Sequence, residues 1–65
     1  MVAVASSMIN DVDYDAENKT LSVTFSNGRT YRYENVPEDE YANLLGASSV
    51  GKYFIANIRD RYRSA

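Results

Sequence analysis

The stretch Leu21–Tyr33, LSVTFSNGRTYRY, decides the fold because it holds two strand patterns joined by one turn signal. In its first part, Leu21–Phe25, apolar and small polar residues alternate, which is typical of a strand with one buried face. Tyr31 and Tyr33 alternate with polar residues in the same way in the second part. The Asn-Gly pair between the two parts favours a tight turn, since both residues tolerate a positive φ. The stretch therefore predicts an antiparallel β-hairpin.

The length of the turn decides which face the two tyrosines occupy. With a two-residue loop, Val23 lies opposite Arg32, and the tyrosines form an aromatic platform on the face away from the core, where nucleobases could stack. With a three-residue loop that places Gly28 in the left-handed region, Val23 lies opposite Tyr31 and the tyrosines join the core. A slip of one residue exchanges the two faces, so these alternatives exclude each other. We favour the second, because so small a core has few aromatic side chains to spare.

The segment before the hairpin predicts a third strand. Val12 and Tyr14 lie on one side of an extended run, and Ile9 is out of step with them. This mismatch indicates a bulge near Asn10. The run DAENKT that follows favours a turn, because Asp and Asn side chains bond readily to nearby backbone.

Two helices are expected after the hairpin. Pro37 begins the first, three acidic residues suit its positive end, and Gly46 ends it as a left-handed cap residue. Ser48 or Ser49 caps the second. Its apolar residues recur every fourth position and basic residues fill its last turns: Val50, Phe54, Ile58 and Tyr62, then Arg59, Arg61 and Arg63. The predicted fold is α+β, a three-stranded antiparallel meander followed by two helices packed on one face, in a single domain spanning residues 1–65.

Composition excludes several classes of function. The chain has 65 residues, a net charge of −2, no cysteine and no histidine. Disulfides and structural zinc sites are therefore excluded, and a general nucleic-acid binder would be more basic. The apolar run at the N-terminus is only five residues long and lacks a preceding basic region, so we expect neither a signal peptide nor a membrane span. The lack of cysteine fits the cytoplasm.

Three aspartates with EF-hand spacing, Asp11, Asp13 and Asp15, do not predict a metal site. Ala16 and Ser22 stand where such a loop needs its glycine and its bidentate acid. Without histidine or cysteine, no catalytic constellation is visible either. We therefore expect no metal, no cofactor and no enzymatic activity.

The start of the second helix is the best candidate site. A helix N-terminus presents free amides and a partial positive charge, to which Lys52 adds a cation and two serines add hydroxyls. Gly51 would let a ligand approach the backbone closely. It is not a Walker A loop, because Tyr53 stands where Ser or Thr must bind magnesium. The competing interpretation is an ordinary N-cap followed by a glycine that lets two helices cross closely. The candidate ligand-binding residues are Ser48, Ser49, Gly51, Lys52, Tyr53, Arg32, Tyr31, Tyr33, Arg59 and Arg63.

Four segments together resemble a known family. They are SSMINDVDYD (6–15), LSVTFSNGRTYRYENVP (21–37), YANLL (41–45) and ASSVGKYFIANIR (47–59). In this order they resemble the KTSC family, the lysine-tRNA synthetase C-terminal domain, over roughly Ser6 to Tyr62. The resemblance implies a small domain that is appended to some lysyl-tRNA synthetases, also occurs alone in bacteria and phages, and has been linked to RNA binding.

These observations lead to one expected function and two alternatives. We expect a non-catalytic binding module for a phosphate-bearing ligand, best a small nucleotide or a cyclic oligonucleotide signal. One copy is too small to enclose such a ligand, so the pocket is expected at a homo-oligomer interface, in a phage or bacterial protein that sequesters the signal. The alternatives are an RNA-binding module and a protein-interaction module whose basic end docks on an acidic surface.

Overall fold

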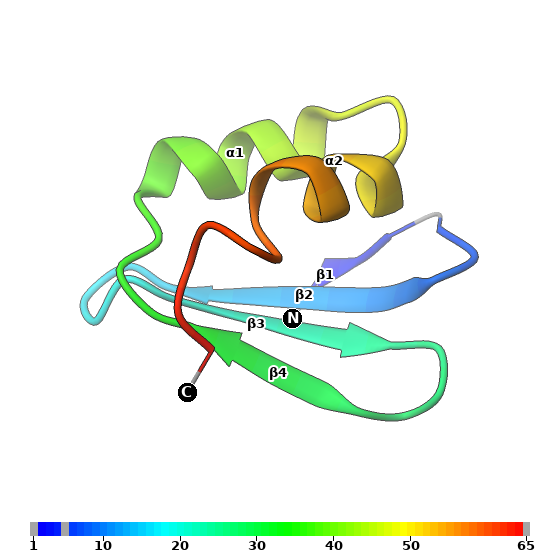
Figure 1. Ribbon diagram of the computed structural model, residues 1–65, viewed down its shortest axis with the longest axis horizontal. Coiled ribbons are helices and arrows are strands. Elements are labelled where there is room, and N and C mark those ends of the chain that lie inside the picture. The colour runs from blue at the N-terminus through cyan, green and yellow to red at the C-terminus, as the bar shows by residue number, and fades with distance from the viewer. Residues whose placement is uncertain (1, 5, 65) are drawn as a thin grey trace.

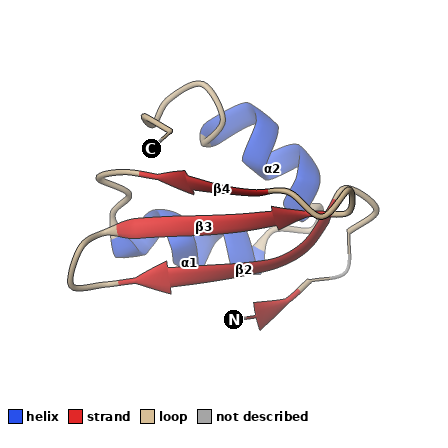
Figure 2. Ribbon diagram, turned by 90° about the horizontal axis from the view of Figure 1, so that it is seen from below, coloured by secondary structure: helices blue, strands red, loops and turns tan. Residues whose placement is uncertain are grey.

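The computed structural model describes residues 2–4 and 6–64 and contains four strands followed by two helices. The strands are β1 (Val2–Ala3), β2 (Ile9–Asp15), β3 (Thr20–Phe25) and β4 (Thr30–Tyr33), and the helices are α1 (Glu38–Gly46) and α2 (Val50–Asn57). The sheet is antiparallel in the order β1-β2-β3-β4, and both helices cover the same face (Figures 1 and 2). The predicted α+β class is confirmed, whereas the predicted number of strands, three, is wrong.

The additional strand is β1, which pairs Val2 with Val12 and Ala3 with Asp11. Two residues are too few to display an alternating pattern, so no local signal marks this strand. Its existence depends on the free edge of β2, which lies ten residues further along the chain.

The hairpin between β3 and β4 has the three-residue loop. Val23 pairs with Tyr31, the amide of Phe25 donates to the carbonyl of Arg29 at 2.8 Å, and Gly28 has a φ of 88°. This left-handed conformation needs glycine, because a Cβ would strain it. The register therefore places both tyrosines on the helix-covered face, together with the apolar residues of β3.

The predicted bulge near Asn10 is also confirmed. The register of β2 against β3 shifts between Ile9 and Asp11. The extra residue returns Ile9 to the covered face, so that Ile9 and Val12 are both completely buried. The core formed in this way lies between the sheet and the helices and consists of Ile9, Val12, Leu21, Val23, Tyr33, Val36, Leu44, Val50, Phe54 and Ile58.

The helix ends differ from the predictions in two places. Gly46 is the last residue of α1, and the only positive φ found for a glycine in residues 2–4 and 6–64 is that of Gly28. The chain leaves α1 through an extended Ala47 instead of a left-handed cap, so the predicted role of Gly46 is wrong. Ser49 is the N-cap of α2, as expected, and accepts a hydrogen bond from the amide of Lys52 at 3.4 Å.

The second difference is that α2 ends at Asn57, so the three C-terminal arginines lie beyond the helix and not in its last turns. The chain turns back to the sheet, where the carbonyl of Arg63 accepts from the amide of Glu34 at 2.8 Å and Ser64 forms a bridge with Tyr33 (Figure 1). These long-range contacts override the local helix propensity. None of the described helices is both long and apolar enough to cross a bilayer.

Candidate functional site

The start of α2 lines an open hollow of about 350 Å³, which we call the serine hollow. Its other wall is the turn that leads into β2. Ser6 shapes this turn, because its Oγ accepts hydrogen bonds from the amides of Met8 and Ile9, both at 3.2 Å. The hollow is lined by Ser6, Ser7, Met8, Ser48, Ser49, Gly51, Lys52 and Ile55.

Gly51 is explained by packing within this hollow. A Cβ at this position would lie 3.3 Å from Ser6 Oγ and 3.6 Å from Met8 Cε. The glycine thus lets the N-terminal segment approach α2. From the sequence, the approaching group was expected to be a ligand or a second helix. The amide of Lys52 is capped by Ser49. The anion-binding capacity of the hollow therefore comes mainly from the lysine ammonium and the serine hydroxyls.

Lys52 is the one charged side chain among the described residues that line the serine hollow, and it is exposed. None of the described residues that line the hollow carries a carboxylate, so none of them offers a counterion that competes with an arriving anion. An ammonium with three donors binds a phosphate as a mobile point charge.

A second hollow of about 400 Å³, the aromatic hollow, lies between the sheet and the end of α2. The rings of Phe25 and Tyr31 meet edge to face here, with centroids 5.4 Å apart. Tyr31 is 38% exposed, whereas Tyr33 is only 5% exposed and contributes mainly to the floor. The lining consists of Met8, Phe25, Tyr31, Tyr33, Phe54, Ile55, Arg59 and Ser64.

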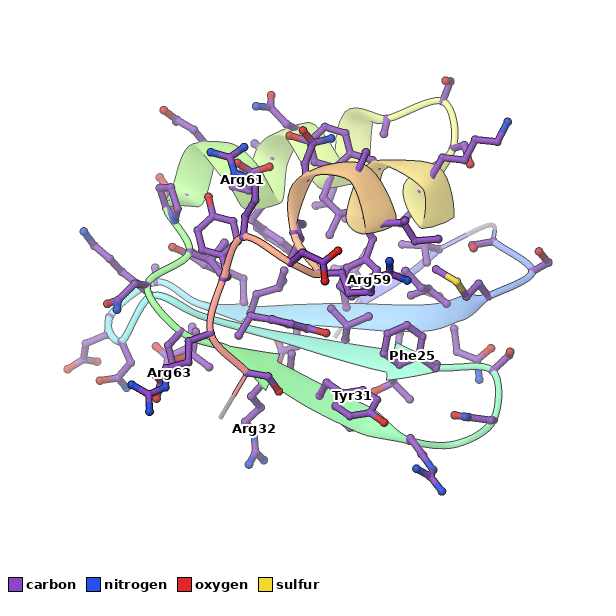
Figure 3. All side chains as sticks on the ribbon, in the orientation of Figure 1. Phe25, Tyr31, Arg32, Arg59, Arg61 and Arg63 are labelled. Carbon is purple, nitrogen blue, oxygen red and sulfur yellow. The ribbon has the colours of Figure 1, made fainter. Side chains whose placement is uncertain are left out.

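Arg59 brings the positive charge to the aromatic hollow. In Figure 3 it reaches from the end of α2 toward Phe25 and Tyr31. Arg59 and Tyr33 line the same hollow. Burial raises the pKa of Tyr33, and the nearby Arg59 charge acts in the opposite direction. Its contact with Asp60, at 3.5 Å, joins two exposed side chains. Such a surface pair stabilises the protein little, so a ligand phosphate can replace the aspartate.

The two hollows adjoin, because Met8 and Ile55 line both. Lys52 and Ile55 are neighbours at i and i+3 on α2, and Arg59 follows in the turn after the helix ends. The combined surface thus has a cation near each end and aromatic rings beside one of them.

Three of the candidate residues lie away from this surface. Arg32 pairs with Ser22 and is on the uncovered face of the sheet. Tyr53 donates from its hydroxyl to Glu40 Oε1 at 2.7 Å and so lies between the helices. Arg63 points away from Phe25 and Tyr31 in Figure 3. The other seven line the two hollows: Ser48, Ser49, Gly51 and Lys52 in one, and Tyr31, Tyr33 and Arg59 in the other.

The sequence did not identify Met8, Phe25 and Ile55 as site residues. Phe25 was expected in the core, and Met8 comes from a turn far from the others in the chain. The sequence did carry a signal for Ile55, because this residue lies outside the apolar stripe of the second helix. In the structure its side chain is 42% exposed. A large aliphatic side chain off the buried stripe of an amphipathic helix indicates a contact surface when it adjoins other apolar groups.

Comparison with known proteins places this geometry in a family. The model of the KTSC domain matches residues 5–62. An uncharacterized protein of Stutzerimonas stutzeri is 45% identical over 53 residues, which are 82% of this chain and 75% of that one. A protein of Tsukamurella paurometabola is 34% identical over 64 residues, 98% and 96% of the two chains.

A solved structure has the same fold. The crystal structure of a KTSC domain protein from Yersinia pestis covers 97% of this chain and 89% of its own, with a TM-score of 0.93 and 33% sequence identity. The family match over most of the chain and the close structural likeness agree with each other. The chain belongs to the KTSC domain family.

Proposed function

We propose that this protein is a non-catalytic binding module for a small phosphate-bearing ligand with a planar ring, such as a nucleotide. The observation that carries the proposal is that the two hollows adjoin and share Met8 and Ile55 in their linings. Each hollow lies near the lower end of the size range of ligand pockets. Together they offer a hydrophilic end with one cation and an aromatic end with another.

The proposed ligand binds with its phosphate at the serine hollow. There Lys52 supplies charge, and the hydroxyls of Ser48 and Ser49 supply donors. The ring enters the aromatic hollow against Phe25 and Tyr31, where a base gains stacking or edge contacts. Arg59 contacts either the ring face or a second phosphate, since a guanidinium suits both.

Small ligands fit the charge distribution better than a long RNA does. Only Lys52 and Arg59 among the basic residues line the two hollows, and Arg32 lies on the opposite face of the sheet. A bound RNA would release a counterion for each phosphate that it exchanges for a basic side chain, so its affinity would fall steeply with salt. A role beside lysyl-tRNA synthetase, which the resemblance implies, belongs to this RNA alternative.

The biological role that fits binding without turnover is sequestration of a nucleotide or cyclic oligonucleotide signal in the bacterial cytoplasm, by a host or a phage protein. Both hollows are open to solvent, so self-association beside them would increase the enclosure of the ligand. The protein-interaction alternative predicts that nucleotides leave the thermal midpoint unchanged, whereas a saturating ligand raises it.

Calorimetric titration with adenosine monophosphate, adenosine and inorganic phosphate tests the proposal. The monophosphate should bind more tightly than either half, and with a shallow salt dependence. Lys52→Gln should weaken its binding roughly tenfold, the equivalent of one charge-assisted hydrogen bond. Lys19→Gln, which changes the chain's other lysine in an exposed turn, is the matched control and should bind like the wild type. Equal binding by both variants, or binding by none of the three probes, would contradict the proposal.

A further inference from the structure

The two edges of the sheet differ in whether another segment covers them. The C-terminal segment covers the edge at β4, through the bridge between Tyr33 and Ser64 and the hydrogen bond from Glu34 to Arg63. The opposite edge is β1, and no described segment pairs with its outer side. Exposed strand edges are usually protected by charges, proline or a covering segment. β1 has neither a charge nor a proline.

The backbone of β1 directs one residue outward. The amide of Val4 donates to the carbonyl of Asn10 at 3.1 Å, so Val4 bonds toward β2. Backbone groups in an antiparallel ladder alternate in direction, which turns the N–H and C=O of Ala3 toward the free edge. Ala3 can therefore exchange two hydrogen bonds with a further strand.

A hollow of about 350 Å³, which we call the edge hollow, lies beside this strand on the helix side. Two of the large hydrophobic side chains that the fold leaves exposed line it, Val2 at 39% and Leu45 at 38%. All its described lining residues are uncharged: Val2, Ala3, Val4, Leu45, Ala47, Ser48 and Val50. A two-fold axis places the same surface on both sides of the interface, so an edge without charges can pair with its own copy without bringing like charges together.

We infer that a second copy of this chain pairs with β1 across a two-fold axis at Ala3. The two Ala3 residues exchange both backbone hydrogen bonds, so that Val2 of one copy lies opposite Val4 of the other and the two sheets become one. Val2 and Leu45 are then covered by the second copy.

Repulsion between the acidic β2 strands does not oppose this arrangement. Three strand spacings of about 4.8 Å each place Asp11 of one copy roughly 14 Å from its equivalent. This separation exceeds the Debye length of about 8 Å at physiological salt. Ser48 lines both the edge hollow and the serine hollow, so the second copy lies next to the proposed ligand site.

Sedimentation equilibrium of the chain without an N-terminal tag tests this inference. The wild type should reach twice the 7.3 kDa of one chain as concentration rises. Ala3→Pro removes only the outward donor, so the chain should keep its fold, verified by circular dichroism, and stay at the mass of one chain. Leu45→Lys tests the same surface from α1 and should also stay monomeric. Ala42→Lys, which introduces the same charge at an exposed apolar position of α1 outside the edge hollow, should associate like the wild type.

Two results would overturn the inference. One is a wild type that keeps the mass of one chain over the whole concentration range, which would leave the edge free or reserve it for another protein. The other is a dimer that persists in both Ala3→Pro and Leu45→Lys, which would place the interface elsewhere. Neither result depends on nucleotide binding, so the inference and the proposed function are tested separately.

Discussion

Two groups of aromatic residues lie at opposite ends of β3, and they are bonded in opposite ways. At one end, Tyr14 stacks on Tyr41 with ring centroids 4.9 Å apart and donates its hydroxyl to the carbonyl of Val36 at 2.6 Å. Glu40 accepts from two further hydroxyls, those of Tyr53 at 2.7 Å and Tyr62 at 3.1 Å. We call Tyr14, Tyr41, Tyr53 and Tyr62 the closed tyrosine group. At the other end, Phe25 and Tyr31 border the open aromatic hollow.

The comparison shows that tyrosine has two roles in this protein, one in stability and one at an open surface. In the closed group the hydroxyls of Tyr14, Tyr53 and Tyr62 meet acceptors inside the protein, and that of Tyr62 connects the C-terminal turn to α1. In the aromatic hollow the Tyr31 ring is partly exposed and lies near an arginine. The first arrangement stabilises the fold and the second leaves surface for a partner. Substitutions at the two ends should therefore separate stability from binding.

The largest effect on stability is expected at Phe54, where the aromatic hollow meets the core. Phe54 is 1% exposed and meets Phe25 and Tyr33 edge to face. Phe54→Ala should lower the free energy of unfolding by about 3–5 kcal/mol, as truncation of a buried aromatic ring does. Ile55→Ala, one position along the same helix but exposed, should cost less than about 1 kcal/mol. Urea denaturation measures both, and similar losses for the two variants would show that the hollow lacks a rigid floor.

The closed tyrosine group should respond next. Glu40→Ala removes the acceptor of two hydroxyls and should lower the free energy of unfolding by about 2 kcal/mol. Asp39→Ala is the matched control, because it removes the same charge from an exposed position in the same helical turn. Affinity for adenosine monophosphate should remain at the wild-type level in Glu40→Ala. A weaker affinity would mean that the two ends are coupled.

Tyr31→Ala should show the reverse pattern. The side chain is half-exposed, so stability should change little, while nucleotide affinity should fall roughly tenfold, within the range for loss of one base-aromatic contact. Tyr31→Phe keeps the ring and should bind nearly as well as the wild type. Calorimetry and thermal unfolding of the two variants give both quantities. Unchanged affinity in Tyr31→Ala would remove this ring from the site.

Alkaline pH should produce the smallest effect, to which Tyr53 and Tyr62 of the closed group contribute. The hydrogen bond to Glu40 raises the pKa of Tyr53, and burial followed by the same carboxylate raises that of Tyr62 above the ordinary 10.0. The folded protein thus holds these protons more tightly than the unfolded chain. Stability is therefore full below about pH 10 and falls as the pH rises through the folded-state pKa. Tyr53→Phe should make this fall in the thermal midpoint shallower, and an identical profile would contradict the assignment.

The sequence predicted those features that local residues determine. The bulge at Asn10 follows from the mismatch of Ile9 with its neighbours, and the N-cap at Ser49 follows from a serine before an apolar stripe. It missed β1 and the return of the C-terminus, because both depend on sheet edges formed elsewhere in the chain. The arginines were misplaced for the same reason, since tertiary pairing ends α2 early.

The candidate site was likewise predictable only where its residues are adjacent in the chain. Ser48, Ser49, Gly51 and Lys52 are contiguous and were found together. Tyr53 was predicted as a site residue only because it follows Lys52 in the chain. On the helix it points in a different direction from Lys52, and its hydroxyl bonds to Glu40. Met8 and Phe25 escaped notice because the fold alone brings their segments beside Ile55.

A titration of the ¹⁵N-labelled protein with adenosine monophosphate, followed by amide chemical shifts, tests the central claim most directly. The predicted result is a saturating set of shifts at Gly51, Lys52, Ile55, Arg59 and Tyr31, which covers both hollows, with little change at Glu40 and Tyr14. Shifts confined to the closed tyrosine group, or no saturable shifts at all, would contradict a nucleotide site that joins the serine and aromatic hollows.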